Sequence, residues 1–226
     1  MPSKSPEMIG LPGFLGFEAI VGLVRTADDS GMLNSAAASW SSADDAFSDI
    51  AQEHDHWCWA AVTAAIHKRV IGVTLAQCEV VRRFRDAGFM VHNGATISGS
   101  PCAEPERFDF DEDISSALSA VSQLSVGIRS RNDDPTPDIV AFANAHLNHD
   151  PPLPMPVLIR YPSHGGTGSN HYICILGRAP GQDRFRIFDP AEGAGSVVCG
   201  VAELNDYNES GERGRWLDFY SWAEIG

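Results

Sequence analysis

The feature that most constrains the fold is a change of pattern along the chain. Residues 57–71 are rich in alanine and contain neither Gly nor Pro, which is typical of a buried helix. After residue 155, short runs rich in Val, Ile, Tyr and Phe are separated by Gly and Pro, which is typical of strands and turns. Helices followed by strands predict an α+β fold with a helical first half and an antiparallel β-sheet in the second half.

Three further helices are predicted between these regions. Residues 74–87 predict a helix that Thr74 caps and Gly88 closes, and Asp113 is predicted to cap a helix over residues 114–124. Proline after Thr136 indicates the start of a helix over residues 139–147. The predicted strands cover residues 126–129, 156–161, 172–176, 184–188, 196–199 and 216–220.

Size and charge exclude several classes of protein. The 226 residues suffice for one sizeable domain. The formal net charge of −14 argues against a nucleic-acid partner, whose binding requires a basic surface. No apolar run approaches the roughly 18 residues of a membrane-spanning helix, so integral membrane association is not expected. We expect an N-terminal extension over residues 1–50 and one domain over residues 51–226.

The extension contains an apolar stretch at residues 8–24. Pro12 and Glu18 interrupt it, which argues against a cleavable secretory signal. A pro-segment, a packed amphipathic arm and a delivery segment remain as alternatives. The location predicted from the sequence is therefore cytoplasmic or secreted.

Cys58 is the candidate nucleophile. It lies in the first turn of the predicted helix, where unpaired backbone N–H groups and the helix dipole favour a thiolate. The competing interpretation is a small buried hydrophobic residue, which is the usual fate of a free cysteine. The five cysteines include no C-x-x-C pair, so a zinc ribbon or thioredoxin site is not supported.

Three other residues complete a catalytic set with Cys58. Gln52 precedes it by six positions, so its amide and the Cys58 N–H can form a two-donor oxyanion hole. His171 opens a predicted strand, and Asp189 ends the next one, opposite the histidine if the two strands form a hairpin. Gln, Cys, His and Asp in this order are the groups that a thiol hydrolase needs.

These residues, together with the Trp-Cys-Trp-Ala-Ala run at residues 57–61, resemble the papain-like cysteine peptidase superfamily. The resemblance covers about residues 50–190. It is strongest to a compact bacterial branch that includes type III secreted effector cysteine proteases, in part because Gln77 and Cys78 follow. Aspartate at position 189 departs from papain itself, where asparagine is usual.

The resemblance implies a peptidase with a papain-like fold and a peptide or protein substrate. Cys58 is then the nucleophile, His171 the base and later the acid, Asp189 the residue that orients the imidazole, and Gln52 the oxyanion donor. No cofactor is implied. Two alternatives remain, namely an amidase or acyltransferase that acts on a small molecule, and an inactive binding module. The oligomeric state is not predicted.

Relatives of this branch often carry cysteines in the region of Cys78 and Cys102, so these two are expected to approach each other. Whether they pair stays open. Residues 11–17 loosely resemble the sites at which the effector proteases cut, which suggests self-processing near Gly16.

Two patterns suggest metal ligands but are better explained otherwise. His54 and His56 alternate with Cys58, yet no second cluster supports zinc. Asp109 and the alternating acids after it lack the later Gly and Glu of a calcium loop, which favours a solvated acidic loop with a helix cap. No metal is expected.

Overall fold

The computed structural model describes residues 47, 50–92, 94–124, 126–130, 143, 153–161, 169–178, 184–191, 195–204, 207–209 and 212–222. The chain separates into two compact units, Met1–Ser39 and Trp40–Gly226, and every described residue belongs to the second. Phe47 is already part of its core, because the buried ring packs against Phe188 with 5.3 Å between centroids. The apolar stretch at residues 8–24, the expected cleavage site near Gly16 and, except for Ala143, the predicted helix over residues 139–147 lie outside the described residues.

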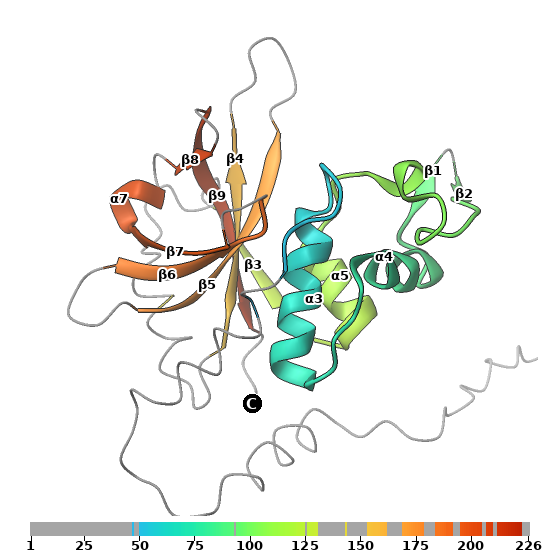
Figure 1. Cartoon of the computed structure of the whole chain (residues 1–226), viewed down its shortest axis with the longest axis horizontal. Coiled ribbons are helices and arrows are strands. Elements are labelled where there is room, and N and C mark those ends of the chain that lie inside the picture. Colours follow the sequence, from blue (N-terminus) through green and yellow to red (C-terminus); the bar gives the residue numbers. More distant parts are fainter. Residues whose placement is uncertain are drawn as a thin grey trace, which may run out of the picture. The chain divides into compact units, whose positions relative to one another are not determined.

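The longest helices of the described residues lie in the first half of the domain (Figure 1). They are α3 (Cys58–Ile71), α4 (Gln77–Asp86) and α5 (Ile114–Ser122), and they pack against one another. All residues of α3 from Cys58 to His67 are buried, which explains why small alanines dominate this helix. The helix ends at Gly72, whose φ of 78° is the left-handed conformation that glycine adopts without strain.

The predicted cap of the second helix is wrong. The helix begins at Gln77, three residues after Thr74, and its N-cap residue Ala76 makes no side-chain cap. The side chain of the first helical residue, Gln77, instead bonds to the backbone of a distant loop. Asp113 does cap α5, because its carboxylate accepts a hydrogen bond from the Ser116 N–H at 2.9 Å.

An antiparallel sheet forms the second half, which confirms the α+β prediction. Its strands follow the order β3-β9-β4-β5-β6-β7, and β8 pairs with β9. The bounds are β3 Val126–Ser130, β4 Met155–Arg160, β5 Asn170–Arg178, β6 Arg184–Asp189, β7 Gly195–Gly200, β8 Tyr207–Glu209 and β9 Glu212–Trp222. Each predicted strand matches one of these, with bounds that differ by a few residues.

The sequence patterns miss the smallest elements. These are a hairpin of β1 (Val91–His92) and β2 (Ala95–Thr96), the 3₁₀ helix η1 (Pro105–Phe108), α7 (Val201–Leu204) and β8. The two hairpin strands have two residues each, all exposed, so they have no apolar alternation to recognise.

The helical half packs against the sheet through two pairs of elements, α3 with β5 and α5 with β3. The sheet contributes a core of buried aliphatic and aromatic side chains that includes Val157, Ile173, Ile187 and Phe219. Among the described residues, no helix is long and apolar enough to cross a membrane.

Candidate active site

Cys58 is the first residue of α3, and its side chain is only 3% exposed. Its N–H precedes the first hydrogen bond of the helix, in which the Ala61 N–H donates to the Trp57 carbonyl at 2.9 Å. The first-turn amides of a helix have no intrahelical acceptor, and the helix dipole is positive here. The sulfur therefore lies where the backbone favours negative charge.

His171 and Asp189 come from the adjacent antiparallel strands β5 and β6. The His171 Nε2 lies 2.7 Å from the Asp189 Oδ1, and both side chains are buried. The Ala191 N–H donates to the same carboxylate oxygen at 2.9 Å. This second bond holds the carboxylate in the orientation that receives the imidazole.

The imidazole of His171 also contacts the nucleophile. Burial by itself lowers the pKa of His171, but hydrogen bonds to Asp189 and Cys58 and their negative charges more than offset this effect and raise the pKa to about 10. Since Nε2 faces Asp189, the other ring nitrogen, Nδ1, is the one that can bond to the Cys58 thiol. The structure thus brings together three of the predicted site residues.

Gln52 lies beside the strand end that carries Asp189. Its backbone N–H donates to the Pro190 carbonyl at 2.6 Å. Its side-chain Nε2 donates to the Asp55 carbonyl at 3.2 Å, while Oε1 is buried and has no hydrogen-bond partner in the described part of the chain. The glutamine is therefore anchored next to the triad by its backbone and within its own loop by its side chain.

A distant loop braces the segment around Cys58. The Trp57 and Trp59 indoles donate to the carbonyls of Phe108 and Phe110, each at 2.9 Å. Both tryptophans are fully buried. The acceptors are backbone carbonyls about fifty residues away, which no side-chain motif predicts.

Between these two carbonyls, Asp109 binds the residue before Trp57. Its carboxylate accepts a hydrogen bond from the His56 N–H at 2.9 Å and lies 3.3 Å from the His56 Nδ1. His54 packs edge-on against the Trp57 ring at 4.4 Å. The two histidines of the apparent metal pattern thus have structural contacts. No group of three or more metal-ligating side chains occurs in the part of the chain described above.

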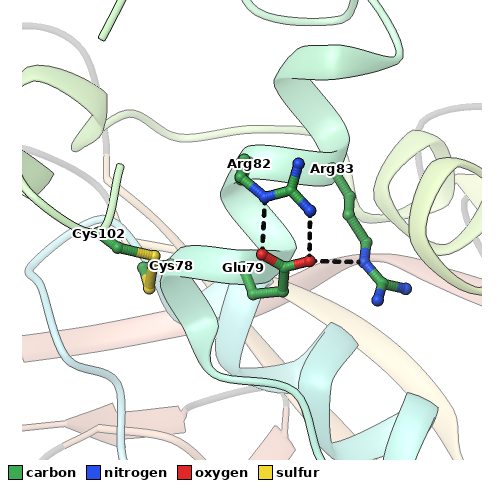
Figure 2. The surroundings of a disulfide bond; sticks show 5 residues. All are labelled: Cys78, Glu79, Arg82, Arg83 and Cys102. Atoms are coloured by element: carbon green, nitrogen blue, oxygen red, sulfur yellow. Dashed lines mark hydrogen bonds and ion pairs between the residues drawn. A yellow bond between two sulfur atoms is a disulfide. The ribbon is translucent and has the colours of Figure 1, made fainter. Parts of the chain in front are cut away.

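Cys78 and Cys102 form a disulfide (Figure 2). It joins the first turn of α4 to the segment that leads into η1, whose last residue Phe108 accepts the Trp57 hydrogen bond. Three free thiols remain, at Cys58, Cys174 and Cys199. Burial raises the pKa of Cys174 well above its usual range and that of Cys199 to about 12, so these two stay protonated at neutral pH, as expected for structural cysteines.

Gln77 is a residue whose importance the sequence patterns did not reveal. In the sequence it contributes only to the resemblance, yet its side chain is 4% exposed and bonds to the loop around Gln52. The sequence does contain a signal for its burial, namely the spacing between Gln77 and the apolar residues that follow it. Gln77 precedes Val80, Val81 and Phe84 by three, four and seven positions, so it lies on the buried face of α4.

Comparison with known proteins gives a likeness of fold. No family model matches this chain, and no curated protein matches it. Among solved structures, the chain is similar to the peptidase domain of ComA from Streptococcus, a bifunctional ABC transporter involved in a quorum-sensing pathway. The two are 14% identical with a TM-score of 0.42, over 78% of this chain and 99% of that domain. At this identity the likeness concerns the fold alone.

Proposed function

We propose that this protein is a papain-like cysteine peptidase. The observation that carries the proposal is the location of His171 between two groups, namely Asp189, whose Oδ1 lies 2.7 Å from the His171 Nε2, and the Cys58 thiol, which helps to raise the pKa of the imidazole. A raised histidine pKa next to a thiol favours the thiolate–imidazolium pair over the neutral pair. The location of Cys58 at a helix N-terminus acts in the same direction.

The reaction follows from these positions. The Cys58 thiolate attacks the peptide carbonyl carbon, the C–N bond breaks, and His171 donates its proton to the leaving amine. Water then attacks the thioester, His171 accepts a proton from it, and the C–S bond breaks to regenerate the thiolate. Asp189 keeps the imidazole in one tautomer throughout, because its Oδ1 accepts the Nε2–H.

The negative charge on the tetrahedral intermediate requires donors. The Cys58 N–H supplies one, and we assign the second to the Gln52 amide. One hydrogen of that amide is directed to the Asp55 carbonyl, and the other is available for the substrate oxygen. Loss of one such donor lowers kcat by about 10²- to 10³-fold in other hydrolases.

The substrate that we propose is a peptide or protein, and the place of action is oxidising. Disulfides such as Cys78–Cys102 persist outside the reducing cytosol, which favours the secreted alternative over the cytoplasmic one. Export by a bacterial secretion system, which the resemblance to effector proteases suggests, is one route to such a location.

Alkylation and peptide cleavage test the proposal together. Iodoacetamide is expected to modify Cys58 far faster than Cys174 and Cys199, and the His171→Ala variant is expected to lose this selectivity. An unbiased peptide library is expected to be cut by the wild type and left intact by Cys58→Ala. Mass spectrometry measures both the alkylation of each thiol and the cleavage of the peptides.

Two other results would contradict the proposal in different ways. Slow alkylation of all three free thiols at one rate, with an intact library, would indicate a binding module. Selective alkylation with an intact peptide library, but turnover of small amides or acyl donors, would indicate an amidase or acyltransferase on the same scaffold.

We also propose that the enzyme removes its own N-terminal extension near Gly16. Cleavage there would leave the wild type shorter than Cys58→Ala by a mass equal to about the first sixteen residues. Intact-mass measurement of both proteins after purification tests this. Equal masses would discard self-processing and leave the peptidase proposal unaffected.

A further inference from the structure

Gln77 makes two hydrogen bonds to the loop that carries Gln52. Its Nε2 donates to the Ala51 carbonyl at 2.6 Å, and its Oε1 accepts from the Glu53 N–H at 3.0 Å. The side chain is almost completely buried. One carboxamide thus bridges the residues that directly precede and follow Gln52.

The two contacted groups determine the conformation of residue 52. The Ala51 carbonyl belongs to the peptide plane before the Gln52 Cα, and the Glu53 N–H belongs to the plane after it. These two planes define the φ and ψ angles of Gln52. A rigid amide that binds both planes therefore restricts both angles. The hydrogen bond from the Gln52 N–H to Pro190 adds a third restraint and ties the same residue to the strand end beside Asp189.

Backbone angles decide where a side chain points, so this restraint acts on the Gln52 amide. We propose that Gln77 is a positioning residue that aims the oxyanion donor, an inference that rests on the proposed peptidase function. At neutral pH, an amide of this length supplies the one donor and one acceptor that these two contacts use. Preorganised donors stabilise a transition state because they need no rearrangement during the reaction.

The disulfide supports the same role from outside the loop. The neighbouring Cys78 is covalently bonded to Cys102, which fixes the first turn of α4 against a second segment of the helical half (Figure 2). Gln77 therefore projects from a helix start whose position is set independently of the Gln52 loop. Because the helix start is held in place, Gln77 can hold the loop in place. A mobile helix end would instead move with the loop.

The test compares Gln77→Met and Gln77→Glu with the wild type on the peptide that the library identifies as best cleaved. Both variants keep the length of the side chain but lose the donor to the Ala51 carbonyl. We expect kcat to fall by about 10- to 100-fold with KM nearly unchanged. Alkylation of Cys58 by iodoacetamide forms no oxyanion, so its rate should stay within about twofold of the wild type.

A double-mutant cycle separates positioning from general damage. In a Gln52→Ala background the donor is already absent, so Gln77→Met should cause no further loss of kcat. Gln77→Glu offers a second readout, because a protonated carboxyl regains one donor. Its kcat relative to that of Gln77→Met should rise at acidic pH. Gln123→Glu, a change of an exposed glutamine at the end of α5, serves as the control and should leave kcat unchanged.

The outcomes distinguish this inference from the proposed function. If the wild type cleaves peptides but Gln77→Met lowers kcat equally in both backgrounds, Gln77 has only a structural role and the peptidase proposal stands. A fall in the alkylation rate as large as the fall in kcat would also indicate a structural role. If the wild type cleaves no peptide and Cys58 is not selectively alkylated, the function itself is wrong and the inference fails with it.

Discussion

The two halves of the candidate site are held in place by different kinds of interaction. His171 and Asp189 lie on adjacent strands, so the backbone ladder of β5 and β6 determines their separation. Cys58 and Gln52 belong to a segment that is irregular until α3 begins. That segment is fixed by bonds between side chains and backbone, from residues between 24 and 53 positions away.

This difference predicts how each half responds to change. A strand ladder contains many equivalent hydrogen bonds, and one altered side chain leaves the ladder intact. The segment around Cys58 depends on a few buried polar contacts, and loss of one leaves its partner unsatisfied. Substitutions in the sheet half should therefore alter chemistry while the sheet stays folded, whereas those in the helical half should also displace the segment that carries the nucleophile.

The largest expected effect comes from Asp189→Ala. The variant removes the acceptor of His171 Nε2 and of the Ala191 N–H. By analogy with removal of the triad aspartate in subtilisin, kcat should fall by about 10⁴-fold. Kinetic measurement on the best-cleaved peptide gives the value, and circular dichroism should show an unchanged sheet. An unfolded variant would contradict the expected separation of chemistry from stability.

Asp189→Asn is the matched control, because both hydrogen bonds use the same oxygen, which asparagine keeps. We expect a smaller fall than for Asp189→Ala, since a neutral acceptor replaces a charged one but the oxygen is kept. Without the negative charge the pKa of His171 should fall below its value of about 10, so the alkaline limit of peptide cleavage, which needs a protonated imidazole for the leaving amine, should move to lower pH.

The same pKa shift makes wild-type stability depend on pH. Because folding raises the pKa of His171 from 6.5 to about 10, its contribution is fully present below pH 6.5 and is lost as the pH rises towards 10. Denaturant unfolding across this interval should show a steeper decline for the wild type than for Asp189→Asn.

Removal of the disulfide should have the next largest effect, and on stability first. The bond spans 24 positions, for which chain entropy predicts a loss of about 3 kcal/mol in the free energy of unfolding. Cys78→Ser with Cys102→Ser, measured by denaturant unfolding, gives this value.

The double serine variant also tests whether the helical half couples stability to chemistry. Release of Cys102 frees the segment that leads to Phe108 and hence the Trp57 contact. We expect kcat to fall as well. Full activity with a large loss of stability would show that the tryptophan contacts alone suffice to hold the nucleophile.

The sequence predicted the sheet half better than the helical half, for the same physical reason. Strand alternation and Gly or Pro turns are local signals, so β4 to β7 and β9 could be located, and with them His171 and Asp189. Antiparallel pairing of consecutive strands then brings the two side chains near each other on one face. They are not directly opposite as predicted, because the register that pairs Cys174 with Phe188 leaves His171 two positions beyond the residue that faces Asp189.

In the helical half, the sequence revealed the helices but not what holds the nucleophile segment. The α3 pattern and the Asp113 cap are local and were predicted. The bonds of Gln77 and of the two indoles to remote backbone groups have no signature, because any residue presents a carbonyl. The helix start was misplaced at Thr74, because the helix begins at Gln77 without any side-chain cap that a local pattern could reveal.

A smaller effect is expected from Trp57→Phe. The change keeps most of the buried ring but leaves the Phe108 carbonyl without its donor, which should lower the free energy of unfolding by about 1–2 kcal/mol. Trp59→Phe is the parallel variant. Its bond to Phe110 is only partly buried, so water can replace the donor and the loss should be smaller. If Trp59→Phe lowered the free energy of unfolding more than Trp57→Phe, burial of the hydrogen bond would not determine the size of the loss.

The smallest effect should arise on the exposed side of α4. Arg82 binds both carboxylate oxygens of Glu79, and Arg83 adds a third contact at 3.0 Å (Figure 2). The hydrogen bond from Arg82, aided by Arg83, lowers the pKa of Glu79 to about 2. Because exposed ion pairs contribute little, Glu79→Gln should lower the thermal midpoint by only about 1–2 °C.

Helix polarity and pH make even this small effect testable. Glu79 lies in the first turn of α4, where a negative charge is favourable, whereas Asp86, which also pairs with Arg82, lies at the last residue of the helix, where it is not. Asp86→Asn should therefore leave the midpoint unchanged or raise it. The Glu79 contribution is present above pH 4.5 and lost as the pH falls towards 2, so wild type and Glu79→Gln should converge there. If the difference between them stayed constant down to pH 2, loss of an ion pair would not be its cause. The new side chain at position 79 would then be disturbing the helix start, and with it Gln77.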